Sequence, residues 1–161
     1  MTEIAEKTPS ITIHADGCCL GNPGPGGYGV VMRQGERLLE LSGGFRKTTN
    51  NRMEILAAII GIEALKGKQK ATLYSDSQYV VKAMKEGWAV KWRRQNWMRN
   101  SKEPAINPDL WERLLQAKAG HQITFQWVKG HAGNPDNERC DQLAKAAASR
   151  ENLPPDSGYL G

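Results

Sequence analysis

The stretch ILAAIIGI at residues 55–62 constrains the fold most, because it lies inside a longer segment with a helical pattern, NNRMEILAAIIGIEALKG. A helix of this sequence is apolar on nearly every side through its middle, and such a helix is buried rather than half-exposed. Gly67 follows it as a candidate C-cap. The chain of 161 residues is long enough to bury this helix in one core and too short to predict two domains. We therefore expect a single domain, residues 1–161, built around the helix.

Predicted strands and helices flank this segment in an order that indicates an α/β fold. Three strands precede it, near 10–16, 27–34 and 37–45, where apolar and polar residues alternate. After it come a strand at 70–76, a helix at 77–86, a tryptophan-rich segment, a helix at 109–120, a strand at 122–130 and a helix from Asn134. This order suits a mixed sheet with helices on its faces and the last two strands parallel to the first. Residues 1–9 and 151–161 are expected to be flexible tails.

Positive charge is concentrated in one part of the chain. Residues 82–102 contain seven Lys or Arg and a single acid, Glu86, so the segment alone carries +6, while the whole chain carries +5. Trp88, Trp92 and Trp97 lie between the basic residues. This combination suits a nucleic-acid backbone together with sugar or base faces. A solvated amphipathic helix is the alternative. It would explain at least one tryptophan packed on the core, but not the concentration of charge.

Four carboxylates are candidates for a metal site, although each one alone also has a structural explanation. Asp16 and Asp76 end predicted strands, at the edge of an open α/β sheet where ligands bind. Asp16 precedes Gly17 and could simply form a turn, and Asp76 could be a helix N-cap. Glu54 could form a capping box with Asn51. Asp141 could form an ion pair with Lys145.

Gathered together, these carboxylates would repel one another unless cations lay between them, and hard oxygen ligands favour Mg²⁺ or Mn²⁺. Two such ions roughly 4 Å apart can activate a water and stabilise the leaving oxygen of a phosphodiester.

The glycine-rich stretch from Ala15 lacks the Lys-Ser or Lys-Thr pair of a phosphate loop. Its adjacent Cys18 and Cys19, with only Cys140 elsewhere, do not complete a zinc site. The acidic cluster and the basic segment together predict a metal-dependent nuclease.

Four motifs carry a resemblance to a known family: ADGCCLGNPGPGGYG, TTNNRME, SDSQYV and WVKGHAGNPDNERCDQLA, in this order and with these separations. The chain resembles the type 1 ribonucleases H, closest to the bacterial single-domain ribonucleases HI, from about Ile11 to Ala148. The resemblance implies the ribonuclease H-like fold, a five-stranded mixed sheet with helices on both faces. It also implies endonucleolytic hydrolysis of the RNA strand of an RNA/DNA hybrid, leaving 3′-hydroxyl and 5′-phosphate ends.

The same resemblance implies the roles of individual residues. The catalytic metal ligands fall on Asp16, Glu54, Asp76 and Asp141, which would hold Mg²⁺ with Mn²⁺ as a substitute; His131 is the catalytic histidine of a mobile loop, and Glu138 is linked to product release. Contacts with the RNA strand fall on Cys19, Asn22, Asn50, Asn51 and Gln78. A pocket for a DNA-strand phosphate falls on Thr49, Arg52 and Asn107, with Trp88 and Trp111 against the sugars. Residues 88–99 resemble the family's basic protrusion, with Lys91, Trp92, Arg93, Arg94, Trp97 and Arg99. Cys18 is a departure, since the family commonly has a smaller hydroxyl residue there.

Two other functions stay open at this point. A non-catalytic hybrid-binding module of the same fold would not need mutually repelling carboxylates, and a transposase or integrase core would not need the asparagines suited to 2′-hydroxyls. The longest apolar run is far shorter than the ~18 residues of a membrane span, and no apolar leader opens the chain. We expect a cytoplasmic monomer that binds RNA/DNA hybrid without a membrane or an obligate protein partner.

Overall fold

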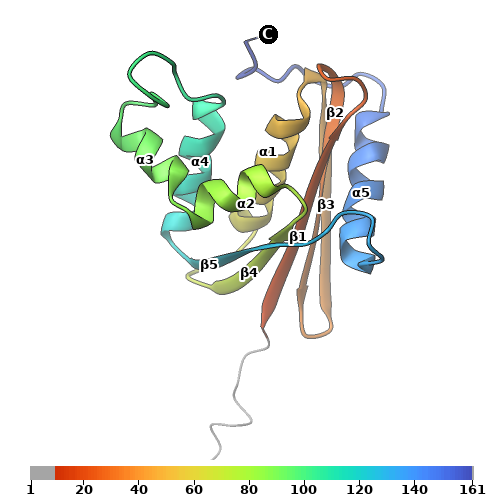
Figure 1. The fold of residues 1–161 in the computed structure, drawn as a ribbon. Helices are drawn as coiled ribbons and strands as arrows, with labels where there is room; N and C mark the ends of the chain where they lie inside the picture. Colours follow the sequence, from red (N-terminus) through yellow and green to blue (C-terminus); the bar gives the residue numbers. More distant parts are fainter. Residues whose placement is uncertain (1–9, 161) are drawn as a thin grey trace, which may run out of the picture.

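The structure, a computed structural model, describes residues 10–160, and these form one sheet with helices on both faces (Figure 1). The strands are β1 (Ile11–Cys19), β2 (Gly24–Gln34), β3 (Arg37–Thr48), β4 (Lys70–Ser75) and β5 (Gln122–Trp127). The helices are α1 (Asn50–Glu63), α2 (Gln78–Lys85), α3 (Trp88–Arg94), α4 (Pro108–Ala119) and α5 (Pro135–Ala148). The predicted fold class, a five-stranded mixed sheet between helices, is confirmed.

The sheet has the strand order β3-β2-β1-β4-β5. Strands β1, β2 and β3 form an antiparallel meander, whereas β4 and β5 run parallel to β1. In the pairing of β1 with β4, Ala15 lies opposite Ser75. The next residues along each strand, Asp16 and Asp76, therefore come side by side at the carboxyl edge of the parallel strands, where ligands bind in such sheets.

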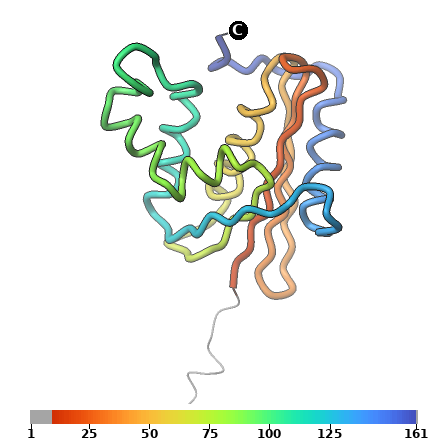
Figure 2. Tube along the Cα trace, in the orientation of Figure 1, coloured from red at the N-terminus to blue at the C-terminus, as the bar shows by residue number. Residues whose placement is uncertain are grey.

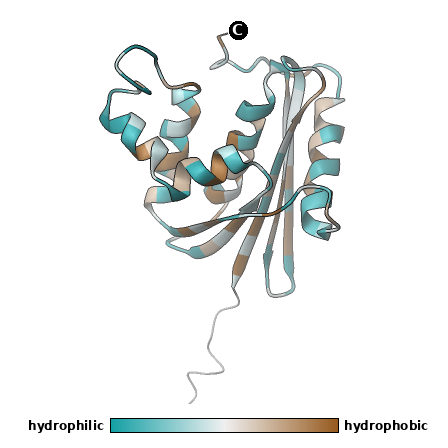
Figure 3. Cartoon of the chain, viewed as in Figure 1, coloured by the Kyte–Doolittle hydropathy of each residue, from teal (hydrophilic) through white to brown (hydrophobic). Residues whose placement is uncertain are grey.

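The central helix α1 is buried as its sequence predicts, because helices and strands cover it on several sides. Met53, Ile55 and Ile59 have no exposed surface. Helix α1 contacts β1, β2 and α4 on one face of the sheet, and α5 covers β1, β2 and β3 on the other face (Figure 1). Figure 3 shows hydrophobic residues concentrated along the strands and hydrophilic residues on the outer turns of α3 and α5. Helix α1 ends with Ala64 as its C-cap, so the prediction of a C-cap at Gly67 is wrong; Gly67, with φ +67°, lies in the following turn.

Strands β1, β2 and β3 are longer than predicted. The predicted strands end at residue 16 and begin at residue 27, but Gly26 and Gly27 pair with Cys19 and Cys18 of β1, which extends both strands. Strand pairing across the sheet therefore outweighs the local turn preference of glycine. Within residues 10–160, no helix combines the length and the apolar composition that a membrane span requires.

The C-terminal segment runs back across the domain toward the N-terminal end of α1 (Figure 2). The Pro154 carbonyl accepts a hydrogen bond from the Arg46 N–H at 2.9 Å, and Asp156 pairs with Arg52. Sequence analysis predicted a flexible tail for residues 151–161, and the structure ties this part of it to β3 and α1. The tail predicted for residues 1–9 lies outside the described residues.

Candidate active site

A cluster of three carboxylates lies at the carboxyl edge of β1 and β4. Asp16 lies in the buried part of β1, Asp76 follows β4, and Glu54 lies near the start of α1. Each offers a carboxylate oxygen, and these oxygens all lie within 4.8 Å of one another. Asp16 and Glu54 are buried, while Asp76 is partly exposed. The structure thus brings together three of the four predicted metal ligands.

Gly17 links two of these carboxylates through its backbone. Its N–H donates to Asp16 Oδ1 at 2.9 Å and to Glu54 Oε1 at 2.7 Å. Helix α1 lies so close to β1 here that a Cβ at residue 17 would overlap the main chain of Met53. Only glycine permits this approach, and the approach in turn brings Glu54 to Asp16. Glu54 does not form the capping box considered for it, because Thr49 is the N-cap and accepts from the Arg52 N–H at 3.3 Å.

The cluster disfavours full ionisation. Burial, followed by the charge of Asp76, raises the pKa of Asp16 to about 7, although the Gly17 N–H and a hydrogen bond with Glu54 oppose this change. Burial and the charges of Asp16 and Asp76 raise the pKa of Glu54 well above its ordinary value. Closely spaced carboxylates behave in this way when no cation compensates their charge. At neutral pH the cluster therefore holds a proton between Asp16 and Glu54, or it takes up a cation.

The helix-capping explanation for Asp76 is wrong. The N-cap of α2 is Ser77, whose Oγ accepts from the Val80 N–H at 3.2 Å. The Asp76 carboxylate is thereby left for the cluster.

Asp141 forms the ion pair that its sequence position suggested, and its role as a metal ligand stays a prediction. Lys145 Nζ lies 2.9 Å from Asp141 Oδ2 on the same face of α5, which is the predicted structural pair. The charge of Asp141 also raises the pKa values of Asp16 and Cys18, so this carboxylate lies near the cluster without belonging to the group of three. An ion pair one helical turn apart with an exposed lysine is weak, so it can open readily.

His131 and Glu138 lie on the segment between β5 and the first turns of α5. His131 is exposed, with φ 54°, in the loop of residues 128–134. Glu138 is exposed in the first turn of α5, which Asn134 caps by accepting from the Asn137 N–H at 3.0 Å. Both side chains are free to meet a ligand from solvent.

The thiols near the cluster do not form a metal or redox site. Burial and the charges of Asp141 and Asp16 raise the pKa of Cys18 to about 11, so its sulfur stays protonated and is a poor nucleophile and metal ligand. Cys18, Cys19 and Cys140 are all free thiols.

A match to a protein family follows the same stretch of chain that builds the cluster. The sequence profile of the RNase H family matches residues 8–149. The chain belongs to the RNase H family.

Relatives and solved structures agree with this family. A Ribonuclease H from Desulforamulus reducens is 65% identical over 146 residues, covering 91% of this chain and 92% of the relative. A Ribonuclease HI from Synechocystis sp. is 52% identical over 157 residues, covering 97% of this chain and 98% of the relative. The crystal structure of LC9-RNase H1, a type 1 RNase H with the type 2 active-site motif, matches with a TM-score of 0.76 and 33% identity, covering 88% of this chain and 73% of that chain. The predicted resemblance to type 1 ribonucleases H, close to bacterial ribonuclease HI, is confirmed.

The residues of this RNase H predicted to contact RNA come from two neighbouring segments and from α2. The Asn50 N–H donates to Asn22 Oδ1 at 3.0 Å, and the Cys19 thiol donates to the carbonyls of Gly24 and Thr48, both at 3.3 Å. These bonds tie the connection between β1 and β2 to the N-terminus of α1. Asn51 and Gln78 are exposed at the starts of α1 and α2. The RNA-contact set therefore flanks the carboxylate cluster.

Arg52 is held by acidic and amide side chains of the chain itself, and its predicted contact with a DNA-strand phosphate stays a prediction. Its side chain is buried, and its guanidinium donates to Asp109, to Asp156 and to the Asn107 Oδ1. Burial opposes the charged form, but the carboxylates outweigh it and raise the pKa of Arg52. Arg52 also links the other two residues predicted for this pocket, because its N–H donates to the Thr49 hydroxyl and its guanidinium to Asn107 Oδ1. The decisive partner Asp156 is 104 residues from Arg52 in the chain, so no local pattern could have revealed it.

Trp111 does not contact a sugar in this structure, because none of its surface is exposed. It packs on Tyr79 with ring centroids 5.3 Å apart and on Trp92 at 6.0 Å. Its spacing to Leu114 and Leu115 places Trp111 on the buried face of α4, and a substrate contact at Trp111 stays a prediction. That periodicity was available in the sequence. Trp88 is only partly buried, so it keeps a surface for a ligand.

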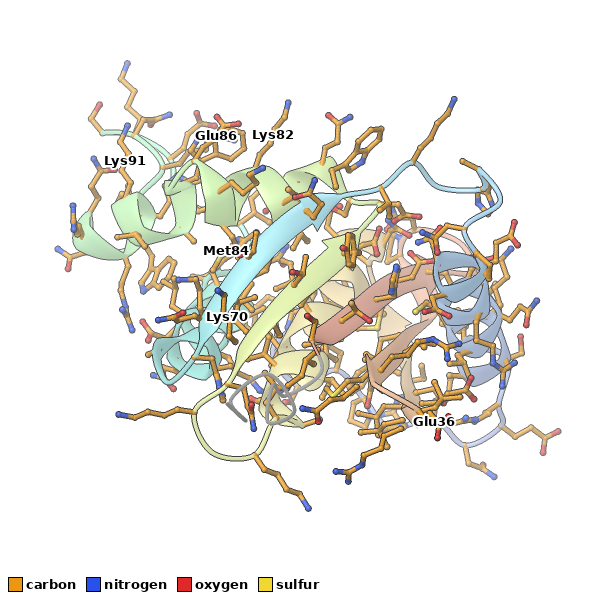
Figure 4. All side chains as sticks on the ribbon, turned by 90° about the horizontal axis from the view of Figure 1, so that it is seen from below. Glu36, Lys70, Lys82, Met84, Glu86 and Lys91 are labelled. Carbon is orange, nitrogen blue, oxygen red and sulfur yellow. The ribbon has the colours of Figure 1, made fainter. Side chains whose placement is uncertain are left out.

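The basic protrusion is α3 with the turns that follow it. Trp88, Trp92 and Trp97 are partly buried and pack against the core, as the alternative interpretation expected for at least one of them. Figure 4 shows Lys82 and Lys91 pointing away from the domain from α2 and α3. Arg93 Nη2 lies 2.6 Å from Glu112 Oε2, and Arg99 Nη2 lies 3.0 Å from Glu103 Oε1. Of the four cations predicted for the protrusion, Arg93 and Arg99 are therefore already paired with acids.

Proposed function

We infer that this chain is an endonuclease that hydrolyses the RNA strand of RNA/DNA hybrids, the activity of the RNase H family to which it belongs. The observation that carries this conclusion is the cluster of Asp16, Glu54 and Asp76, two of them buried, within 4.8 Å. A non-catalytic hybrid-binding module gains nothing from such a cluster, because burying mutually repelling carboxylates lowers stability. A transposase or integrase core is disfavoured by the family match over residues 8–149.

The donor set fits Mg²⁺, with Mn²⁺ as a substitute. Carboxylate oxygens are hard ligands, and the raised pKa values of Asp16 and Glu54 reflect burial first and then neighbouring negative charge, which a divalent cation would compensate. Asp16, Glu54 and Asp76 would hold the metal, and Asp141 would join them once its pair with Lys145 opens. Bound divalent ions supply an activated water and Lewis-acid stabilisation of the leaving oxygen. The expected products, with 3′-hydroxyl and 5′-phosphate ends, require breakage of the bond between phosphorus and O3′.

Other residues of the chain position the substrate and move protons. His131, on its exposed loop, exchanges a proton with the reacting groups, and Glu138 assists product release. The polar residues Cys19, Asn22, Asn50, Asn51 and Gln78 contact the RNA strand, where a 2′-hydroxyl distinguishes RNA from DNA. A DNA-strand phosphate binds at Thr49 and Asn107, which Arg52 holds in place, and Trp88 meets a sugar. Lys91 and Arg94 of the protrusion contact backbone phosphates.

The proposed location is the cytoplasm. The free thiols of Cys18, Cys19 and Cys140 suit a reducing compartment. The expectation of a monomer without an obligate protein partner stays a prediction.

One assay tests the class of activity. Labelled RNA/DNA hybrid, double-stranded DNA and single-stranded RNA are each incubated with the protein in Mg²⁺ and in EDTA. We expect cutting of the hybrid alone, in Mg²⁺ alone, with 5′-phosphate products. Asp16→Asn serves as the matched control for a contaminating nuclease. Hybrid binding without any cutting would favour the binding module, and cutting of double-stranded DNA would favour the transposase or integrase core.

A further inference from the structure

The end of the outer strand β5 lies against Asp76. The Trp127 indole N–H donates to the Asp76 carbonyl at 3.1 Å, and the Val128 N–H donates to the Ser75 carbonyl at 3.0 Å. On the side-chain side, a Cβ at Gly130 would come within 2.7 Å of Asp76 Oδ2. Residues 127–130 therefore contact both the main chain and the carboxylate of Asp76.

Asp76 depends on this segment more than the other two carboxylates do. Asp16 and Glu54 are buried and share the Gly17 N–H, whereas Asp76 is partly exposed. Among the described residues, no hydrogen bond reaches the Asp76 carboxylate. Its orientation is set by its backbone and by the neighbours that press on it, namely Trp127 and Gly130.

Trp127 is unusually exposed for a tryptophan at the end of a strand. Its side chain follows the buried Ile123 and Phe125 on the same face of β5, yet it is 43% exposed. Beside it, Gln78, Val81 and Lys82 of α2 help to line a cavity of about 430 Å³. Burial alone does not explain an indole at this position, because a phenylalanine would cover the same apolar surface. The feature that phenylalanine lacks is the N–H, which is the group that meets Asp76.

We propose that Trp127 is a positioning residue for the metal ligand Asp76, and that it couples this ligand to the loop of residues 128–134 that carries His131. The indole N–H holds the backbone at Asp76, and Gly130, three residues further on, lies against the carboxylate. A partner of this kind orients a metal ligand without touching the metal. This inference rests on the proposed function of the carboxylate cluster.

The test is the Mg²⁺ affinity of the free protein, measured by isothermal titration calorimetry. Trp127→Phe removes the N–H and keeps a ring, and we expect it to weaken Mg²⁺ binding by roughly 10-fold, the lower end for loss of a group that orients a ligand. In cleavage assays, kcat should fall at low Mg²⁺ and recover at high Mg²⁺, while KM for the hybrid stays unchanged. Gln126→Ala, at the preceding exposed position of β5, is the matched control and should leave both quantities unchanged.

Two further variants keep the result interpretable. Gly130→Ala places a Cβ against the Asp76 carboxylate and should weaken Mg²⁺ binding even if Trp127→Phe does not fold. Asp76→Asn should remove most of the Mg²⁺ binding. If it does not, the metal site of the proposed function is wrong. If Asp76→Asn abolishes binding while folded Trp127→Phe binds Mg²⁺ as the wild type does, the positioning role alone is wrong. A raised KM with unchanged Mg²⁺ affinity would likewise overturn it, and would make Trp127 a substrate contact.

Discussion

At the residue scale, the negative charge of the carboxylate cluster lowers the stability of the fold. Asp16 has an ordinary pKa of 3.8 and a folded pKa of about 7. Because its ionised form is disfavoured by the fold, ionisation destabilises the protein: the effect is absent below about pH 4, grows between pH 4 and 7, and is complete above pH 7. A side chain of the same shape without the charge should remove this effect.

Asp16→Asn tests both the proposed cleavage activity and the destabilisation caused by ionisation of Asp16. We expect it to abolish cleavage in Mg²⁺ while hybrid binding is largely kept, since the acid holds metal rather than nucleic acid. In metal-free buffer at pH 8 the variant should be more stable than the wild type by at most a few kcal/mol, because one pKa unit corresponds to about 1.4 kcal/mol. The gain should vanish near pH 4. Urea unfolding across this pH range measures it, and a variant that is less stable at pH 8 would contradict the electrostatic account.

His131→Ala should slow turnover without stopping it. A single acid-base group contributes about 10²-fold or more, so kcat at saturating hybrid should fall by roughly 10²-fold. Because His131 is exposed and outside the cluster, the Mg²⁺ affinity and the free energy of unfolding should not change. Steady-state cleavage rates give kcat for the wild type and the variant, and calorimetry on the same two proteins gives their Mg²⁺ affinities. Either complete inactivity or an unaltered kcat would show that its role is different.

At the element scale, the sequence predicts much of the fold, and the reasons for its errors are physical. The buried α1 and the parallel β1 and β4 follow from hydrophobic pattern and element order, which also bring Asp16 to Asp76. The sequence pattern does not predict the full length of β1 and β2, because glycines favour turns locally. Only pairing across the sheet extends these strands. The pairing of Arg93 with Glu112 joins α3 to α4 across 19 residues, so composition alone overstates the free charge of the protrusion.

The protrusion can therefore be divided into paired and unpaired cations. Lys91→Gln with Arg94→Gln should raise the KM for hybrid, because these side chains are exposed and carry no described ion pair, while kcat at saturation stays unchanged. The log-log salt slope of binding should fall by up to ~0.9 per contact removed. Arg93→Gln with Arg99→Gln should have a smaller effect, since both cations are paired with glutamates.

Lys66→Gln with Lys68→Gln, in the connection between α1 and β4, matches the change in net charge away from the protrusion. It controls for long-range attraction to the hybrid. Equal losses of affinity in all three double variants would mean that net charge alone draws the hybrid. An unchanged KM and salt slope for Lys91→Gln with Arg94→Gln would mean that the protrusion is a solvated surface.

At the scale of the whole molecule, the C-terminal segment closes the fold over the end of α1. Asp156 accepts from Arg52 Nε at 2.7 Å and from the Thr48 hydroxyl at 2.7 Å. Burial acts to raise the pKa of Asp156, but the hydrogen bonds from Arg52 and Thr48 outweigh it, so the pKa is lowered. A carboxyl with a lowered folded pKa stabilises the protein above its ordinary pKa, and this contribution is lost as the pH falls through the folded value.

Asp156→Asn should therefore destabilise the protein at pH 7 by about 1.5–3 kcal/mol, the range for a hydrogen bond to a charged group. The difference from the wild type should shrink as the pH falls below the ordinary value of 3.8, where the wild-type carboxyl is also becoming protonated. Asp109→Asn is the matched control. It also pairs with Arg52, but its side chain is 44% exposed against 10% for Asp156, so its loss should be smaller. Urea unfolding of the three proteins at pH 7 and at pH 3 decides the matter: a difference that persists unchanged at pH 3 would mean that Asp156 acts by packing rather than by its charge.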